Sequence, residues 1–334
     1  MTLVRLVPIA CAALALNGCV AAAIPVAAGG AIAGKRLIGD GDRAAPATAA
    51  ADEAAPATIA RLIEGPLPPP VPNPPPGMQY LYGSGEAAAL SVQSYMQLAN
   101  FLIARSTDRS VGHEIPSVVL APGATLAAPS FVPCGDKPLA LVLDVDETAV
   151  LNLGYEQAEA RSGTGYDAQR WDRWEKTGAA QVAAVPGASV AIDVARRMNI
   201  AVVFNSNRSA VNAQQTVDAI AAAGLGSAVH LDTLWLRGDV GEGSAKDPRR
   251  ARIADKYCVI AMAGDQLGDF SDLFNAPDVS LATRRETVQS RKLELLWGQG
   301  WFMLPNPVYG SGLQGGYDDI FPADKQWADP AGGQ

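Results

Sequence analysis

The sequence of 334 residues contains only two histidines, His113 and His230, and they lie far apart. This argues against a zinc site built from several histidines and against catalysis that needs several of them. Acidic residues outnumber basic ones, 34 to 26, and no cluster of Lys and Arg alternates with aromatic side chains. Binding to a nucleic acid polymer, which depends on neutralising phosphates, is therefore not expected. Any catalysis must use other side chains.

Long apolar runs are also missing, and the one that follows Arg5 is too short to span a bilayer as a permanent helix. We interpret residues 1–18 as a secretion signal peptide. The segment 16–19 (LNGC) resembles a bacterial lipobox, in which the final Cys, here Cys19, becomes the lipidated first residue of the mature chain. A plain signal peptide cut elsewhere is the alternative. Val20, in place of an Asp, favours an outer-membrane lipoprotein exposed to the periplasm of a Gram-negative bacterium.

Only two cysteines follow residue 19, namely Cys134 and Cys258. In an oxidising compartment they can form a disulfide. Cys134 precedes the apolar run 139–143 and Cys258 opens another, so two neighbouring parallel strands would bring the two thiols together. Two buried free thiols are the alternative.

Composition divides the rest of the chain. Residues 19–77 are rich in Ala, Gly and Pro, with proline runs at 66–70 and 74–76. Such a segment cannot form a sheet ladder or a sustained helix, and it predicts a tether that is extended near its end as polyproline II. Residues 78–325 are predicted to form the folded domain, and 326–334 a flexible tail.

Short apolar runs within the predicted domain indicate strands, at 139–143, 200–204, 229–236 and 259–263. Helical spacing of apolar residues indicates helices, at 85–104, 190–198 and 210–223. Continuous apolar strands that alternate with helices predict an α/β fold with a parallel sheet covered on both faces. The active site of such a sheet lies at the carboxyl ends of its strands.

Polar segments follow the predicted strands at those ends. The first strand is followed by 144–148 (DVDET), the second by 205–208 (NSNR) and the last by 264–269 (GDQLGD), and a basic turn lies at 246–250 (KDPRR). We expect all four segments to converge on one crevice. Their order resembles the four motifs of the haloacid dehalogenase superfamily, in its phosphotransferase branch.

This resemblance implies a Rossmann-like parallel core with a small helical cap at about 149–199, and Mg²⁺ as the cofactor. The metal would be held by the carboxylates of Asp144 and Asp265 and by the backbone carbonyl of Asp146, with Asp269 in the surrounding shell. Asp144 would be the nucleophile that forms an aspartyl phosphate. Asp146 would protonate the leaving alkoxide and later deprotonate the attacking water.

The remaining motif residues receive roles from the same resemblance. Ser206 would hydrogen-bond the transferred phosphoryl group, with Asn207 and Arg208 beside it as substrate-binding residues. Lys246 would balance the phosphoryl charge and orient the nucleophile. Thr148 would orient the catalytic acid.

Further segments extend the match, at 81–86 (LYGSGE), 171–174 (WDRW), 184–188 (AVPGA) and 304–310 (LPNPVYG). Over about 78–315 the chain resembles the bacterial outer-membrane lipoprotein e acid phosphatase and 5′-nucleotidase family, of the class C acid phosphatase branch. That family implies phosphomonoesterase activity on nucleoside monophosphates, including nicotinamide mononucleotide, with the nucleoside between aromatic rings. The candidate rings, for each of which core packing is the alternative, are those of Tyr155, Trp171, Trp174 and Tyr309.

Two positions depart from the family pattern. Asn205 stands where a more apolar or aromatic residue is usual, and 311–316 lacks a tryptophan-rich ending. We predict a membrane-tethered, Mg²⁺-dependent phosphomonoesterase that releases phosphate and nucleosides from small esters, and a homodimer is left open. A non-catalytic ligand-binding lipoprotein on the same fold is one alternative. A phosphotransferase that passes the phosphoryl group to an acceptor hydroxyl is another.

Overall fold

The structure is a computed structural model that describes residues 73–241 and 243–330. The predicted signal peptide, Cys19 and the tether as far as residue 72 lie outside these residues. Within the described ranges, no helix combines the length and the apolar character that a membrane span requires.

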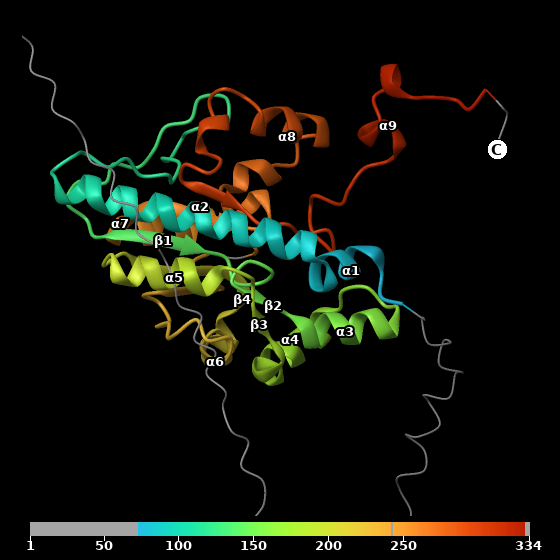
Figure 1. Cartoon of the computed structure of the whole chain (residues 1–334), viewed down its shortest axis with the longest axis horizontal. Helices are drawn as coiled ribbons and strands as arrows, with labels where there is room; N and C mark the ends of the chain where they lie inside the picture. The colour runs from blue at the N-terminus through green and yellow to red at the C-terminus, as the bar shows by residue number, and fades with distance from the viewer. Residues whose placement is uncertain (1–72, 242, 331–334) are drawn as a thin grey trace, which may run out of the picture. The chain divides into compact units, whose positions relative to one another are not determined.

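Five strands form the central sheet, in the order β5-β4-β1-β6-β7, and every neighbouring pair is parallel. Strands β1 and β4 of this sheet are labelled in Figure 1. Strands β1 and β6 are buried along their whole length, which is why their sequences are unbroken apolar runs. Four strands lie where the apolar runs predict them, whereas the short β7 was not predicted. The strands of the sheet are β1 (Leu139–Leu143), β4 (Ala201–Ser209), β5 (Leu234–Arg237), β6 (Cys258–Gly264) and β7 (Trp301–Met303).

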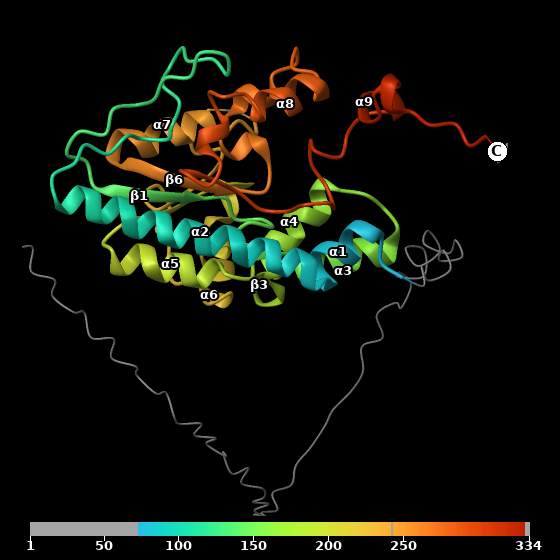
Figure 2. The ribbon, with the colours of Figure 1, turned by 45° about the horizontal axis from the view of Figure 1, so that its top comes forward.

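Helices cover both faces of this sheet. The α-helices are α1 (Pro76–Gly83), α2 (Gly85–Ser110), α3 (Leu153–Ser162), α4 (Ala168–Thr177), α5 (Ala188–Arg197), α6 (Ala213–Ala222), α7 (Asp247–Lys256), α8 (Leu281–Val288) and α9 (Tyr317–Ile320). Helices α2, α5 and α6 lie on one face, and α7 and α8 lie on the other (Figure 2). Within β1, Leu141 packs toward the first group and Val142 toward the second. The predicted α/β fold is confirmed.

Short 3₁₀ helices connect several of these elements. They are η2 (Ala179–Gln181), η3 (Ala210–Asn212), η4 (Leu267–Asp269), η5 (Asp272–Asn275), η6 (Glu294–Leu296) and η7 (Ala323–Lys325). Two of them, η4 and η5, follow β6 directly and pack against each other, so they shape the carboxyl edge of the sheet.

The described chain begins with a helix that packs beside the site. Helix α1 starts at Pro76, so residues 76 and 77 of the predicted tether are helical. Proline suits this first turn because its nitrogen needs no intrahelical partner there. The next helix begins after Ser84, whose hydroxyl accepts from Ala87 N at 3.1 Å. Gly77 packs against the Pro307 carbonyl, where no side chain would fit, so α1 is docked on the segment after β7.

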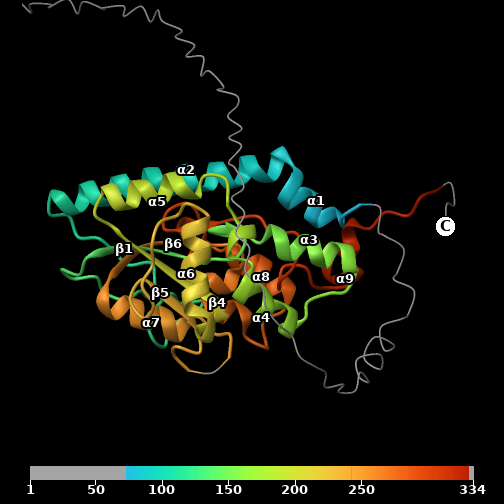
Figure 3. The ribbon, with the colours of Figure 1, turned by 90° about the horizontal axis from the view of Figure 1, so that it is seen from below.

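The segment between β1 and β4 has two parts. Strands β2 (Val150–Leu151) and β3 (Ala183–Ala184) form a short antiparallel ribbon, and α3 and α4 lie between them in sequence. These two helices lie at the same end of the sheet as α1 (Figure 3). Helix α5 packs instead along α2 and contributes Ala191 and Ile192 to the core. The predicted cap, about 149–199, therefore includes a helix of the core layer.

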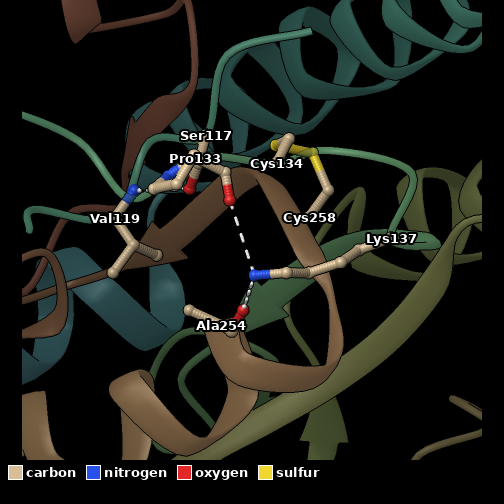
Figure 4. The surroundings of a disulfide bond; sticks show 7 residues. All are labelled: Ser117, Val119, Pro133, Cys134, Lys137, Ala254 and Cys258. Atoms are coloured by element: carbon tan, nitrogen blue, oxygen red, sulfur yellow. Dashed lines mark hydrogen bonds between the residues drawn. A yellow bond between two sulfur atoms is a disulfide. The ribbon is translucent and has the colours of Figure 1, made fainter.

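A disulfide joins Cys134, in the loop before β1, to Cys258, the first residue of β6 (Figure 4). Because β1 and β6 are parallel neighbours, Leu139 lies opposite Cys258, and the two cysteine Cα atoms are 4.6 Å apart. Lys137 spans the same region and donates to the Ala254 carbonyl oxygen at 2.7 Å. The structure thus contains the disulfide and not two free thiols.

Reduction of this disulfide should lower the free energy of unfolding by about 4 kcal/mol, since the bond closes a long loop in the unfolded chain. The two cysteines are 124 positions apart. Thermal unfolding with and without reductant measures the effect, and a Cys134→Ser/Cys258→Ser variant should no longer respond to reductant. An unchanged melting temperature, with both thiols titrated as free, would contradict the expectation.

Candidate active site

The loop after β1 places two aspartates in different surroundings. Asp144 continues the strand ladder, and its N–H donates to the Ala263 carbonyl of β6 at 3.0 Å. Asp146 follows two residues later, immediately before Glu147, which adopts a left-handed conformation with φ of 53°. Such a conformation costs a non-glycine residue about 1–3 kcal/mol and persists only where neighbours hold it. The chain therefore turns sharply between Asp146 and Thr148.

Glu147 is held by one nearby residue and by two tyrosines from distant parts of the chain. Its carboxylate accepts from Tyr309 OH at 2.5 Å, from Asn152 N at 2.8 Å and from Tyr82 OH at 3.2 Å. Burial, and then the charge of Asp146, raise the pKa of Glu147 to about 7. Sequence reasoning assigned no role to Glu147, Asn152 or Tyr82. Glu147 lies inside the first motif and Tyr82 inside the segment 81–86. Their positions in segments that match the family were the signal in the sequence that could have marked them as site residues.

Three buried carboxylates, those of Asp144, Asp265 and Asp269, meet at the carboxyl ends of β1 and β6. One oxygen of each lies within 4.8 Å of the others. Lys246 Nζ binds Asp144 Oδ1 and also donates to Asp269 Oδ1 at 2.6 Å. The structure therefore brings together residues from three of the four predicted segments.

The charges of this cluster do not balance. Burial raises the pKa of Asp144 well above its ordinary range; Lys246 opposes the shift, and the charges of Asp269 and Asp265 add to it. Burial and the charge of Asp269 raise the pKa of Asp265 to about 6. Burial also opposes the charge of Lys246, but Asp144 and Asp269 outweigh it and raise the pKa of the amine. One ammonium does not neutralise three carboxylates, and the three carboxylate oxygens are a ligand set that fits a hard divalent cation.

The resemblance implied that Thr148 orients Asp146, but in the structure Thr148 contacts Asp265 instead. Its hydroxyl donates to Asp265 Oδ1 at 3.0 Å, while the Asn306 amide donates to Asp265 Oδ2 at 2.7 Å. The left-handed turn at Glu147 separates Asp146 from Thr148 and places the threonine beside β6. Thr148 thus fixes a member of the carboxylate cluster.

Asp146 is held by its own pair of residues. Arg208 Nε donates to Asp146 Oδ1 at 2.8 Å, and Asn152 Nδ2 donates to the same oxygen at 2.9 Å. Arg208 Nη2 also donates to Asn152 Oδ1 at 2.7 Å. The three side chains therefore form a closed ring of contacts, separate from the carboxylate cluster.

Only part of the second motif, 205–208, lines the cavity. Arg208 is 2% exposed and points to Asp146, so it does not line the cavity as a substrate-binding residue would. Ser206 is fully buried, and its Oγ accepts from Arg208 N at 3.1 Å and lies 3.4 Å from Asp146 Oδ2. Asn207 is exposed and lines the cavity. Of these three predicted substrate-binding residues, only Asn207 borders the open space.

A cavity of about 880 Å³ opens beside Asp144 and Lys246. Three of the four predicted aromatic residues line it, namely Tyr155, Trp171 and Tyr309. The Tyr155 and Trp171 rings pack edge to face, with centroids 4.8 Å apart and planes at 82°. The cavity therefore joins a charged region to an aromatic wall.

Trp174 is not part of that wall. Its ring covers Gly178 so closely that a side chain there would overlap it, and its Nε1 donates to Asn152 Oδ1 at 3.1 Å. Trp174, which was predicted as a candidate to bind the base, is therefore not among the residues that line the cavity. Trp174 packs within the protein beside Tyr155, with ring centroids 6.2 Å apart, whereas Trp171 lines the cavity.

Comparison with known proteins decides the family. The model for the haloacid dehalogenase (HAD) superfamily, subfamily IIIB (Acid phosphatase), matches residues 111–312. The chain belongs to this subfamily. Its fold is similar to that of the class C acid phosphatase from Bacillus anthracis, with a TM-score of 0.55 and 23% identity over 71% of this chain and 84% of that one. The tungstate-bound crystal structure of that enzyme matches with a TM-score of 0.53 and 22% identity, over 71% of this chain and 84% of that one.

Membership of subfamily IIIB defines the reaction class as phosphomonoester hydrolysis. HAD phosphatases generally use a divalent metal, and the cluster of Asp144, Asp265 and Asp269 offers buried carboxylates for one. The acid phosphatase fold and the charged end of the cavity therefore point to the same chemistry.

Glu156 of α3 gives this acid phosphatase a testable dependence of stability on pH. Burial, followed by the charges of Glu147 and Glu159, raises the pKa of Glu156 from 4.5 to about 8. The folded state thus binds its proton more tightly than the unfolded state does. The stability that it contributes is complete below about pH 4.5 and is lost as the pH rises through about 8.

In urea unfolding, we expect the free energy of unfolding of wild type to fall between about pH 5 and about pH 9. In Glu156→Gln this fall should be smaller, by an amount on the order of 2 kcal/mol. Glu86→Gln, at an exposed carboxylate of α2, is the matched control and should leave the slope unchanged. Equal slopes for wild type and Glu156→Gln would contradict the assignment.

Proposed function

We propose that this protein is a Mg²⁺-dependent phosphomonoesterase that hydrolyses nucleoside monophosphates and similar small esters through an aspartyl phosphate on Asp144. The observation that carries the proposal is that two nearby aspartates have different contacts. Asp144 lies in the buried cluster with Lys246, and Asp146 lies in a separate ring with Arg208 and Asn152. Two carboxyl groups in different surroundings suit a nucleophile and a general acid.

The proposed reaction has two steps. In the first, an Asp144 carboxylate oxygen forms a bond to phosphorus while the ester P–O bond breaks, and Asp146 gives its proton to the departing alkoxide. In the second, Asp146 takes a proton from water, whose oxygen attacks phosphorus and breaks the bond to Asp144. Inorganic phosphate leaves, and both side chains return to their starting states.

The surrounding residues support these steps. Arg208 and Asn152 fix the direction of the Asp146 carboxyl group. Lys246 binds Asp144 and adds positive charge next to the cavity. The carboxylates of Asp144, Asp265 and Asp269, with the Asp146 carbonyl, would hold Mg²⁺, which supplies the charge neutralisation that lets a carboxylate approach a phosphate dianion.

The aromatic wall supports the choice of substrate. Tyr155, Trp171 and Tyr309 border the same cavity as Asp144, and an aromatic base can pack against such rings. The cavity of about 880 Å³ is in the size range of small-molecule sites and has room for a nucleoside beside the phosphoryl position. Nucleoside monophosphates therefore suit both halves of the cavity.

Adenosine monophosphate should be hydrolysed with Mg²⁺ present, and chelator should abolish the phosphate release. Asp144→Asn should lower kcat by about a thousandfold or more, because it removes the carboxylate that forms the proposed covalent intermediate. Acid quenching during turnover should trap phosphorylated wild-type protein and none of the variant. Asp193→Asn, an exposed aspartate of α5, is the control and should retain activity.

Failure of the folded, metal-loaded wild type to release phosphate from this substrate and from an aryl phosphate would sink the proposal. That outcome would favour a ligand-binding module on the same fold.

The sequence supports a proposal about location. Residues 16–19 carry the lipobox-like LNGC segment, so Cys19 would be acylated and would tether the enzyme to the outer membrane, with the active domain in the periplasm. A lipid anchor of this kind would keep the enzyme where impermeable phosphate esters arrive.

Expression in a Gram-negative host should label the protein with radioactive fatty acid and place it in the outer-membrane fraction. Cys19→Ala should lose the label, because the acylated thiol is gone. The control is Cys11→Ala, a change within the proposed signal peptide. The labelling and the fractionation of this variant should match those of wild type. Equal labelling of Cys19→Ala and wild type would disprove the anchor.

A further inference from the structure

A buried arginine lies next to the candidate catalytic residues without a carboxylate partner. Arg249, in the first turn of α7, is only 1% exposed. Its Nε donates to Asn205 Oδ1 at 2.8 Å, and its Nη2 donates to Asn207 Oδ1 at 2.6 Å. Within residues 73–241 and 243–330 it forms no ion pair, whereas the adjacent Arg250 pairs with Asp247. The partners of Arg249 are therefore neutral amides.

A buried guanidinium with neutral partners is costly. Transfer of a charge from water to the interior is unfavourable unless an opposite charge accompanies it. Burial accordingly lowers the pKa of Arg249, and the nearby charge of Asp144 opposes that shift. An anion in the cavity that Asp144 lines would add the countercharge that Arg249 lacks.

Asn205 explains how the arginine is held. The family pattern has a more apolar or aromatic residue at this position, yet Asn205 is 2% exposed within the sheet. Its Oδ1 accepts from Arg249 Nε, and its Nδ2 lies 3.4 Å from the Lys246 carbonyl oxygen. The amide thus joins β4 to the start of α7. This departure in the sequence and the buried arginine form one unit.

Asn207 is the part of this unit that reaches the cavity. A guanidinium has only donors, so the Asn207 atom that faces Arg249 must be the carbonyl oxygen. The Nδ2 group is then directed away from Arg249, and it donates to no partner within the described part of the chain. Asn207 is exposed and lines the cavity with Asp144 and Lys246. An amide donor without a partner in the described part of the chain therefore belongs to a residue of the same cavity wall as Asp144.

We infer that Arg249 is a positioning residue which, held by Asn205, fixes the Asn207 amide so that its Nδ2 donates to an oxygen of the phosphoryl group. This inference rests on the proposed phosphatase function of the same cavity. Asn207 would contact the substrate directly, and Arg249 would act through it. Lysine could not replace the arginine, because an ammonium cannot serve two amide oxygens with a rigid fork.

The test is the binding of inorganic phosphate to the full chain in detergent with Mg²⁺, measured by isothermal titration calorimetry. Asn207→Ala and Arg249→Lys should each weaken phosphate binding by about tenfold or more, as expected for loss of a hydrogen bond to a charged group. The double variant should bind no more weakly than Asn207→Ala alone, because Arg249 acts through Asn207. Arg252→Gln, an exposed arginine of α7, is the matched control.

Two results would overturn the inference: wild-type affinity in Arg249→Lys, or additive losses in the double variant. If Arg249→Lys does not fold, Asn207→Asp decides the question. This change gives Arg249 a carboxylate partner and removes the donor, so it should weaken phosphate binding without lowering the melting temperature. Unchanged phosphate binding in Asn207→Asp would also overturn the inference.

The inference and the proposed function fail in different ways. If wild type neither binds phosphate nor hydrolyses adenosine monophosphate, the phosphatase proposal itself fails. If wild type does both, and Arg249→Lys matches it in phosphate affinity, only the role of Arg249 is lost.

Discussion

The buried ammonium of Lys246 is the interaction on which the active site depends. Asp144, Asp265 and Asp269 are crowded where two parallel strands end, and the charge of Asp269 raises the pKa of both Asp144 and Asp265. Lys246 binds Asp144 and Asp269 together, and its own backbone N–H donates to Asp272 at 2.9 Å. Removal of one partner from such a buried group leaves an uncompensated charge. The cluster is therefore a functional arrangement that burial alone would disfavour.

The second constraint is the turn that separates two aspartates only two residues apart. Glu147 takes a left-handed conformation, and this directs Asp146 to Arg208 while Asp144 stays in the cluster. Tyr82 and Tyr309, from opposite ends of the described domain, both donate to Glu147. Segments before and after the sheet thus stabilise the strained turn. This explains why α1 packs beside the site although it provides no carboxylate, and the loop after β7 also holds Asp265 through Asn306.

Much of the fold and part of the site follow from local sequence. Buried parallel strands need unbroken apolar runs, so β1 and β6 are visible in the sequence, and polar residues directly after them must lie at one edge of the sheet. The disulfide was open at that level, because pairing depends on which strands are neighbours. The contacts of Thr148 and Trp174 could not be predicted for a related reason. Each side chain's direction is set by a turn or a helix face that spacing alone does not specify.

By itself, the sequence determined the α/β class and the order of the four polar segments, because these depend on hydrophobic runs and on position along a strand. The residues of the carboxylate cluster were implied by the resemblance to the haloacid dehalogenase superfamily. Only the tertiary structure decided which donor meets which oxygen. Asn152 joins Asp146 to Arg208, and Arg249 joins Asn205 to Asn207, through contacts between residues far apart in the chain. Hydrogen bonds act over about 3 Å and need alignment, so such partners are fixed only once the packed sheet has brought their side chains together.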